Sequence, residues 1–295
     1  MSKYRLIHRT IYHYNQAVRL GHHNLHLCPR NDGGQRLLQH HLRITPEPQF
    51  CADNLDAEGN ATTDLYFSNS SVEQLILESE SWVEMTRSNP FNYLLEPWAI
   101  ALPFDYPASL LRSLQPYLHN PASGEALSGD VIDWAQAILH QQQNNASTFL
   151  TELNQTINQR STYEVRHTGA PQPAGLTLNC NAGSCRDFAV LFIAACRAVG
   201  LAARFVSGYQ AGDPDQTHRE LHAWAEVYLP GGGWRGFDPT LGLAVADGHI
   251  ALAASAEPRQ VAPVTGSVER VFGEGSTTAG SSSRLEHQIE LEILN

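Results

Sequence analysis

Hydrophobic residues recur at three- and four-residue spacing in the stretch NCNAGSCRDFAVLFIAACR (179–197), which is typical of a helix. Apolar residues also fill most of its other side, so this helix should be buried nearly all round. Ser184 followed by Asp187 predicts the helix start with a partial capping box, and Gly200 predicts its end. Cys185 should therefore stand in the first turn of a buried central helix.

The same spacing predicts three earlier helices, at 108–115, 130–142 and 146–159. Pro116 is expected to stop the first of them, because proline lacks the backbone N–H that continues a helix. The sequence Ser-Gly-Asp at 128–130 is a plausible cap for the second. The middle of the chain is therefore predicted to be helical.

Alternating polar and apolar residues, which are typical of strands, dominate two other regions. In residues 4–84, short alternating runs are separated by turn clusters such as 56–60, which predicts an antiparallel β-sandwich. Farther on, residues 221–229 alternate cleanly, a triple-glycine turn follows at 231–233, and residues 234–237 run back as the partner strand. This second pattern predicts a β-hairpin.

The patterns divide the chain into an N-terminal β-sandwich domain (1–88), a proline-rich linker (89–107) and an α+β core (108–265). Residues 266–283 are rich in Gly, Ser and Thr and are expected to be flexible, and 284–295 alternate again as a C-terminal strand. A chain of 295 residues is long for a single hydrophobic core, which agrees with this division.

Composition narrows the class of protein. With 42% hydrophobic and 17% charged residues the chain should be globular, and no stretch approaches the roughly 18 apolar residues of a membrane span. The first residues alternate and lack the apolar core of a secretory signal, so we expect a cytoplasmic protein. A formal net charge of −11 argues against nucleic acids and anionic membranes as partners. Composition indicates no oligomeric state.

The five cysteines are an odd number and are too sparse for a disulfide framework. Cys185 differs from the others because the start of a helix favours an anion, which lowers the pKa of a thiol. The N–H groups of the same turn could also hold an oxyanion. A cysteine that merely packs a tight turn is the alternative, and the rest of the chain bears on the choice.

The predicted hairpin supplies chemical partners for this thiol. His222 opens its first strand and Asp238 closes its second, so the two side chains should lie at the same end. A cysteine activated by a histidine that an acid orients is a Cys-His-Asp triad. In such a triad His222 takes the proton of Cys185 and later protonates the leaving group, while Asp238 holds the ring tautomer.

Three motifs follow one another along the chain: Gly-x-Cys-x-Asp at 183–187, His-Ala-Trp at 222–224 and Asp-Pro-Thr at 238–240. Together with the β-rich region before them, they resemble the bacterial transglutaminase-like proteins, relatives of animal transglutaminases, peptide N-glycanases and papain-like thiol enzymes. The resemblance implies a papain-like α+β core, in which the cysteine, histidine and aspartate of these motifs form the catalytic triad. It also implies the N-terminal β domain of the bacterial group.

By this resemblance the protein should be an acyl-transfer enzyme that acts on peptide or isopeptide amide bonds through a thioester. The superfamily contains peptidases, amidases, cross-linking transferases and inactive members, so resolution by water and by an amine both stay open. The expected partner is a protein or peptide substrate, and no cofactor is expected. Calcium dependence is not implied, because the chain has no dense acidic loop like the calcium sites of animal transglutaminases.

Further candidate site residues surround the motifs. Alternation puts Trp224 on the strand face of His222, which favours a place in a substrate cleft, and so a contact with substrate, over a place in the core. The side chain that completes an oxyanion hole is left open among three candidates: Tyr163, Asn179 and Asn181.

Three alternatives stay open beside the triad. Arylamine N-acetyltransferases also use Cys-His-Asp in this order, but their cysteine lies much nearer the N-terminus. A zinc site is conceivable from Cys180, Cys185, His218 and His222, yet its connector of 32 residues is long for a zinc finger, so no metal is expected. A degenerate core could serve as a binding or assembly module, although all three triad residue types are present.

Overall fold

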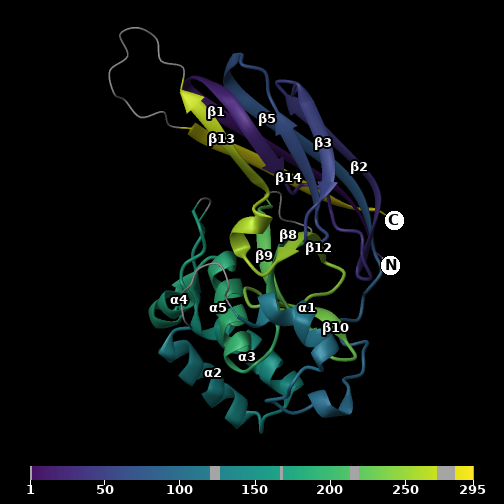
Figure 1. Cartoon of the computed structure of the whole chain (residues 1–295), viewed down its shortest axis with the longest axis vertical. Helices are drawn as coiled ribbons and strands as arrows, with labels where there is room; N and C mark the ends of the chain where they lie inside the picture. Colours follow the sequence, from purple (N-terminus) through teal and green to yellow (C-terminus); the bar gives the residue numbers. More distant parts are fainter. Residues whose placement is uncertain (1, 120–126, 167–168, 213–218, 271–282, 295) are drawn as a thin grey trace.

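The computed structural model describes residues 2–119, 127–166, 169–212, 219–270 and 283–294, and the structural statements that follow concern these residues. The fold is α+β, as the sequence predicts. Figure 1 shows a β domain, drawn at the top, above a core that contains the helices and a second sheet. The predicted N-terminal β domain and the predicted α+β core are both present.

The N-terminal β domain is built around one long strand, β1 (Lys3–Leu25). It pairs antiparallel with β5 (Ser71–Met85) along most of its length. Three shorter strands, β2 (Gln35–Thr45), β3 (Phe50–Leu55) and β4 (Ala61–Tyr66), complete the order β2-β5-β1-β4-β3. Alternation along these strands buries one set of leucines and leaves the polar set outside, which is why the sequence pattern has period two.

The C-terminal strands return to this domain. β13 (Val264–Arg270) and β14 (Ser283–Leu294) both pair antiparallel with β1, and β14 occupies the edge of β1 opposite to β5. The predicted C-terminal strand is thus present. Of the segment predicted to be flexible, residues 266–270 belong to β13 and residues 271–282 lie outside the described residues.

The described residues contain five α-helices. They are α1 (Ala108–Leu118), α2 (Gly129–Gln141), α3 (Ala146–Arg160), α4 (Ala174–Cys180) and α5 (Cys185–Ala198). Four of them match the predicted helices within a few residues, whereas α4 has no counterpart among the helices that the sequence predicts. None of these helices has both the length and the apolar character needed to cross a membrane.

The first helix continues through Pro116 instead of stopping there. Proline removes one backbone N–H, so the Arg112 carbonyl loses its intrahelical donor, and the helix ends two residues later at Leu118. The last turn is held from outside. The centroid of the Tyr117 ring lies 4.9 Å from that of the Trp234 ring. The backbone carbonyl of Tyr117 accepts a hydrogen bond of 3.0 Å from Arg197 Nε.

The second sheet has the strand order β11-β10-β9-β8-β12. Its members are β8 (Ala203–Gln210), β9 (Leu221–Leu229), β10 (Gly233–Asp238), β11 (Leu243–Ala244) and β12 (His249–Ser255). The β9–β10 pair is the predicted hairpin. The shortest elements are β6 (Thr162–Tyr163), β7 (Ala182–Gly183) and the 3-10 turns η1 (Pro97–Ala99) and η2 (Pro258–Val261).

Helix α5 is buried on nearly all sides, as its sequence predicts. Phe188, Leu191 and Phe192 are 2% exposed or less, and the ring of Phe192 stacks on that of Phe237 at 5.5 Å between centroids. Each such side chain contributes about 1.5–3 kcal/mol to stability on burial. The helix is therefore a rigid support for the cysteine in its first turn.

In Figure 1 the strands β8, β9 and β12 lie between the helices and the N-terminal β domain. An apolar cluster joins the two parts: Tyr4, Leu6, Val83, Met85, Tyr209, Ile250, Leu252 and Ile289. The linker (89–107) packs on the helical core through Tyr93, Leu95 and Phe104. The two domains thus share a buried interface, and the strands that carry the histidine and aspartate motifs lie close to it.

Candidate active site

The candidate nucleophile Cys185 is the first residue of α5, and 6% of its surface is exposed. The backbone N–H and the hydroxyl of Ser184 both donate to Oδ2 of Asp187, at 2.7 and 2.8 Å, which closes the first turn as the capping motif predicts. The N–H of Cys185 belongs to the group that a helix leaves without intrahelical partners. It is available to a negatively charged oxygen beside the thiol.

The other oxygen of Asp187 holds the adjoining loop. Oδ1 accepts hydrogen bonds from the Arg166 guanidinium at 2.8 Å and from the Gln172 N–H at 2.7 Å. The carboxylate is fully buried, so these donors offset the cost of removing its charge from water. Gly183 permits the close approach, since a Cβ there would lie 2.8 Å from the Cβ of Asp187. The glycine and aspartate of the first motif therefore shape the turn around the thiol.

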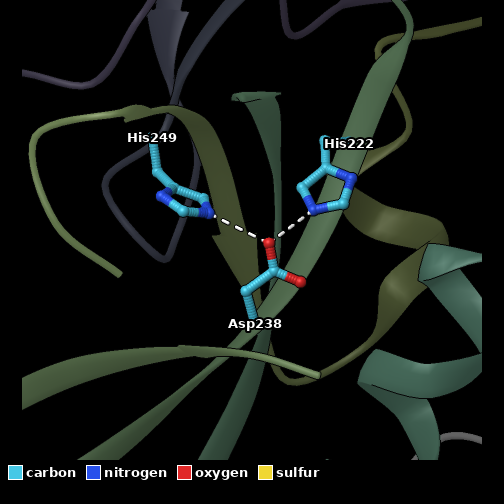
Figure 2. Close-up of side chains that lie close together, drawn as sticks. All are labelled: His222, Asp238 and His249. Carbon is cyan, nitrogen blue, oxygen red and sulfur yellow. Dashed lines mark hydrogen bonds and ion pairs between the residues drawn. The ribbon is translucent and has the colours of Figure 1, made fainter. Parts of the chain in front are cut away.

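His222 and Asp238 meet at one end of the hairpin, as the sequence predicts. Nε2 of His222 lies 2.7 Å from Oδ2 of Asp238 (Figure 2). The carboxylate is fully buried, and its Oδ1 accepts the N–H groups of Thr240 at 2.9 Å and Leu241 at 3.3 Å. The Asp-Pro-Thr motif thus forms a turn that holds the carboxylate. Because Nε2 is taken, Nδ1 is the ring nitrogen left for the thiol.

The carboxylate controls the protonation of the ring. Burial by itself would lower the pKa of His222, but the charge of Asp238, its hydrogen bond, and a hydrogen bond with the Cys185 side chain outweigh burial and raise this pKa to about 10. Burial would raise the pKa of Asp238, yet the charge of His222 and the hydrogen bonds from both neighbouring imidazoles hold it well below its usual value. At neutral pH the pair is therefore imidazolium and carboxylate.

A second imidazole contacts the same carboxylate. Nε2 of His249 lies 3.0 Å from Oδ2 of Asp238, opposite the ring of His222 (Figure 2). His249 begins β12 and is 6% exposed. Sequence reasoning missed it because the run HIALAAS shows no alternation and matches no motif. A buried polar residue at the head of an apolar run is the one available signal, and it is a weak one.

A cavity of about 520 Å³ opens between the core and the N-terminal β domain. Cys185 and His222 line it from the core. The β domain supplies the facing wall, from β1 and β14: His8, Thr10, Tyr12, Leu285 and His287. Its volume lies in the range of small-molecule and cofactor sites, and the thiol and the imidazole are both accessible from inside it.

Comparison with known proteins agrees with this geometry. Residues 132–239 match the family described as the transglutaminase-like superfamily, and residues 4–84 match the bacterial transglutaminase-like N-terminal region. An uncharacterized protein of Mycobacterium tuberculosis is 31% identical over 279 residues, which cover 90% of this chain and 87% of that protein. The chain belongs to the transglutaminase-like superfamily. This confirms the family that the three motifs indicated, and favours it over the arylamine N-acetyltransferases.

Two further proteins, one of them a solved structure, are similar to the transglutaminase-like chain. The crystal structure of a protein from Cytophaga hutchinsonii named "Putative Cysteine Protease" has a TM-score of 0.72 and 19% identity, and covers 100% of this chain and 91% of that one. This likeness shows a shared fold across both domains. A protein-glutamine gamma-glutamyltransferase of Pseudomonas aeruginosa is 28% identical over 148 residues, 47% of this chain and 21% of that protein.

Of the three oxyanion candidates in the transglutaminase-like core, Tyr163 lies beside the thiol. It pairs with Gly183 across β6 and β7 and lines the cavity. Burial, then the charges of Cys185 and Glu220 and a hydrogen bond with Cys185, raise the pKa of Tyr163 to about 12. Its hydroxyl therefore keeps its proton at neutral pH and can donate to an oxyanion.

The two asparagine candidates are engaged elsewhere. The side-chain amide of Asn179 donates to Asp130 at 3.1 Å, and that of Asn181 accepts from Arg160 at 2.8 Å. Neither residue lines the cavity that contains Cys185. The structure thus brings Tyr163 to the thiol but not the two asparagines.

Trp224 lies behind the histidines and does not line this cavity. It is 1% exposed, and its ring centroid is 6.3 Å from that of His222 and 5.3 Å from that of His249. It packs with Val206, Ala251 and Ala254. This place in the transglutaminase-like core fits the interpretation of Trp224 as a core residue, rather than the predicted contact with substrate.

His222, Asp238 and His249 also form a group of possible metal ligands, with one ligand atom of each within 4.8 Å of the others. Donor atoms around tetrahedral zinc are roughly 3.3 Å apart, given Zn–N bonds of about 2.0–2.1 Å. The N···O distances of 2.7 and 3.0 Å here instead fit hydrogen bonds. For the alternative zinc set, Cys180 is exposed at the end of α4, and His218 lies outside the described residues.

Proposed function

We propose that this chain is a thiol-dependent acyl-transfer enzyme that acts on peptide or isopeptide amide bonds. Cys185 is the nucleophile, His222 the acid–base group and Asp238 the residue that supports the ring. The observation that carries the proposal is the place of His222, whose ring is hydrogen-bonded to Asp238 and lines, together with Cys185, the wall of one cavity. A degenerate binding module would have no need of this linked arrangement.

In the first half-reaction Cys185 acts as a thiolate paired with the imidazolium of His222, whose Nδ1 carries the proton. The thiolate attacks the amide carbonyl carbon, a C–S bond forms, and the carbonyl oxygen becomes an oxyanion. The N–H of Cys185 and the hydroxyl of Tyr163 are the donors that would stabilise it. When the C–N bond breaks, the imidazolium protonates the leaving amine, and the acyl group remains on Cys185 as a thioester.

In the second half-reaction water or an amine attacks the thioester while His222 takes its proton. The C–S bond breaks and the Cys185 thiolate returns to its pairing with the imidazolium. Water gives a carboxylic acid, and an amine gives a new amide. The relatives support either outcome, since one is named a gamma-glutamyltransferase and another a putative protease. A protein or peptide substrate is the partner we propose.

The test is alkylation of the protein with limiting iodoacetamide at pH 5 to 9, followed by mass spectrometry of each cysteine. Cys180 is exposed and serves as an internal reference, whereas Cys185 is buried and would react more slowly if it were an ordinary thiol. We expect Cys185 to react faster than Cys180 below pH 8, and to lose this preference in His222→Ala. Reaction of Cys185 at or below the rate of Cys180 in the wild type would point to a degenerate module.

The reaction type can be determined on one protein substrate. Casein would be incubated with and without a fluorescent primary amine. Mass spectrometry would then show whether its glutamine side chains are modified and whether its peptide bonds are cleaved. Amine incorporation that is absent from Cys185→Ala supports transfer, and cleavage or deamidation without incorporation supports hydrolysis. Products of equal yield in Cys185→Ala would contradict the assignment of Cys185 as the nucleophile.

A further inference from the structure

One oxygen of the Asp238 carboxylate receives two imidazole donors. His222 contacts Oδ2 at 2.7 Å and His249 contacts it at 3.0 Å. A carboxylate offers only acceptors, so Nε2 of His249 must carry the proton in this contact. His249 is 6% exposed and lies outside the cavity that contains Cys185, so it is not placed to meet a substrate there.

The hydrogen bonds on the carboxylate fix its rotation. Oδ1 accepts from the N–H groups of Thr240 and Leu241, and Oδ2 accepts from the two rings. A carboxylate has about four acceptor sites, so these donors occupy all of them. Without His249, the side-chain partner of Oδ2 would be the same His222 ring that it has to orient. His249 therefore directs Oδ2 independently of the ring that exchanges protons.

The strand that begins with His249 is itself held by the N-terminal β domain. β12 is the edge strand of its sheet, so one side of its backbone needs partners from elsewhere. The side-chain amide of Gln35 accepts from the Ala251 N–H at 2.8 Å and donates to the Ala251 carbonyl at 2.9 Å. Asn60 does the same at Ala254, at 2.8 and 2.9 Å. These two amides take the place of a neighbouring strand.

We propose that His249 is a positioning residue, which directs the Asp238 carboxylate toward His222, and that Gln35 of the N-terminal β domain supports His249 through Ala251. This inference rests on the proposed thiol chemistry of Cys185. It gives the N-terminal β domain a second role beside lining the cavity: it holds the strand from which the carboxylate is oriented.

The experiment compares His249→Phe, which keeps a ring but removes the donor, with His249→Gln, whose amide N–H can replace Nε2–H. The alkylation rate of Cys185 by iodoacetamide at pH 6 to 8 is measured relative to that of Cys180. We expect His249→Phe to lower this ratio about tenfold, a fraction of the 10²–10⁴ that general acid–base catalysis contributes. His249→Gln should stay within about threefold of the wild type, since it restores the hydrogen bond.

Two internal controls separate positioning from folding and from the proposed function. Cys196 is fully buried, so its labelling reports any unfolded fraction of a variant. If His222→Ala lowers the Cys185 rate but His249→Phe does not, the positioning role is overturned while the proposed function stands. If His222→Ala has no effect either, the proposed function itself fails. Equal losses in the Phe and Gln variants, with Cys196 protected, would also overturn the positioning role.

The contribution of the N-terminal β domain is tested with a matched pair of variants. Gln35→Leu removes both amide contacts to Ala251, two residues from His249, and leaves the Arg30 N–H as the remaining donor to the Ala251 carbonyl. It should lower the Cys185 ratio about threefold. Asn60→Leu removes the equivalent support at Ala254, farther along β12, and should leave the ratio unchanged. Support through Ala251 would be contradicted if both variants lowered the Cys185 ratio equally, or if neither variant lowered it.

Discussion

The two ends of the candidate triad are built in different ways. The cysteine end is local, because Gly183, Ser184 and Asp187 shape the turn around Cys185 within one short stretch of chain. The aspartate end is assembled from β9, β10 and β12, with β12 held by side chains of the N-terminal β domain. The comparison shows that residues close in sequence suffice to position the thiol of Cys185, whereas the orientation of its base, His222, depends on distant parts of the fold.

This difference predicts two kinds of mutational effect. A change at the assembled end should act mainly on the reactivity of Cys185, because the carboxylate there governs His222. A change at the local end should act mainly on the free energy of unfolding, because the donors around Asp187 hold a buried charge.

The largest effect is expected for Asp238→Asn. The amide would turn an N–H toward Nε2 of His222 and favour the wrong tautomer, so acylation of Cys185 by p-nitrophenyl acetate should slow by about 10³–10⁴. Single-turnover release of p-nitrophenol measures this rate, with Cys185→Ala as the blank. A decrease of less than tenfold would show that the carboxylate is not needed to direct the ring.

At the local end, Asp187→Asn should lower the free energy of unfolding by about 3–5 kcal/mol, because the amide removes a buried charge and turns an N–H toward donors that now bond the carboxylate. Urea denaturation measures the loss, and Arg166→Gln is the control. In Arg166→Gln the N–H of Gln172 and the N–H and hydroxyl of Ser184 still donate to the buried carboxylate, so this variant should lose less stability. Acylation by the folded Asp187→Asn protein should fall less than in Asp238→Asn; a larger fall would remove the contrast between the two ends.

The His222–Asp238 pair also predicts a pH dependence of stability. Its folded pKa of about 10 lies above the unfolded value of 6.5, so the stabilisation is fully present below pH 6.5 and is lost as pH rises toward 10. The difference in unfolding free energy between wild type and His222→Gln should therefore shrink from pH 6 to pH 10. A difference that is flat or grows over this range would be inconsistent with a protonated His222 in the folded protein.

The smallest effect is expected for Asn60→Ala, which removes both amide contacts to the Ala254 backbone. The free energy of unfolding should fall by about 1–3 kcal/mol, since a buried N–H and carbonyl lose their partners. Asn54→Ala is the matched control, because Asn54 is exposed and bonds Asp64 at the surface; its loss should stay within about 0.5 kcal/mol. Equal losses would mean that the Asn60 contacts add little to the edge of β12.

The start of α5 and the hairpin that brings His222 to Asp238 could be predicted from sequence. The apolar spacing and the Ser184–Asp187 pair marked the start of α5, and the clean alternation of β9 and β10 placed His222 and Asp238 at one end of a hairpin. These signals work because capping, helix burial and hairpin pairing all act between residues near one another in the chain.

The rest depends on contacts between distant residues. His249 stands 11 residues after Asp238, in an apolar run whose strand is completed by Gln35 and Asn60, and no local pattern encodes that pairing. The strand face of Trp224 was predictable, but whether that face met a cavity or a packed core depended on what β12 placed against it. The return of β14 to β1 could not be inferred for the same reason.

The most direct test of the account is the protonation state of His222, followed by ¹⁵N NMR of the imidazole from pH 6 to 11. We predict that both ring nitrogens stay protonated at pH 8 in the wild type, with a pKa near the value of about 10. In Cys185→Ala this pKa should fall, because the contribution of the thiol is removed. A ring that titrates near 6.5 and does not respond to Cys185→Ala would contradict the proposed linkage of thiol, imidazole and carboxylate.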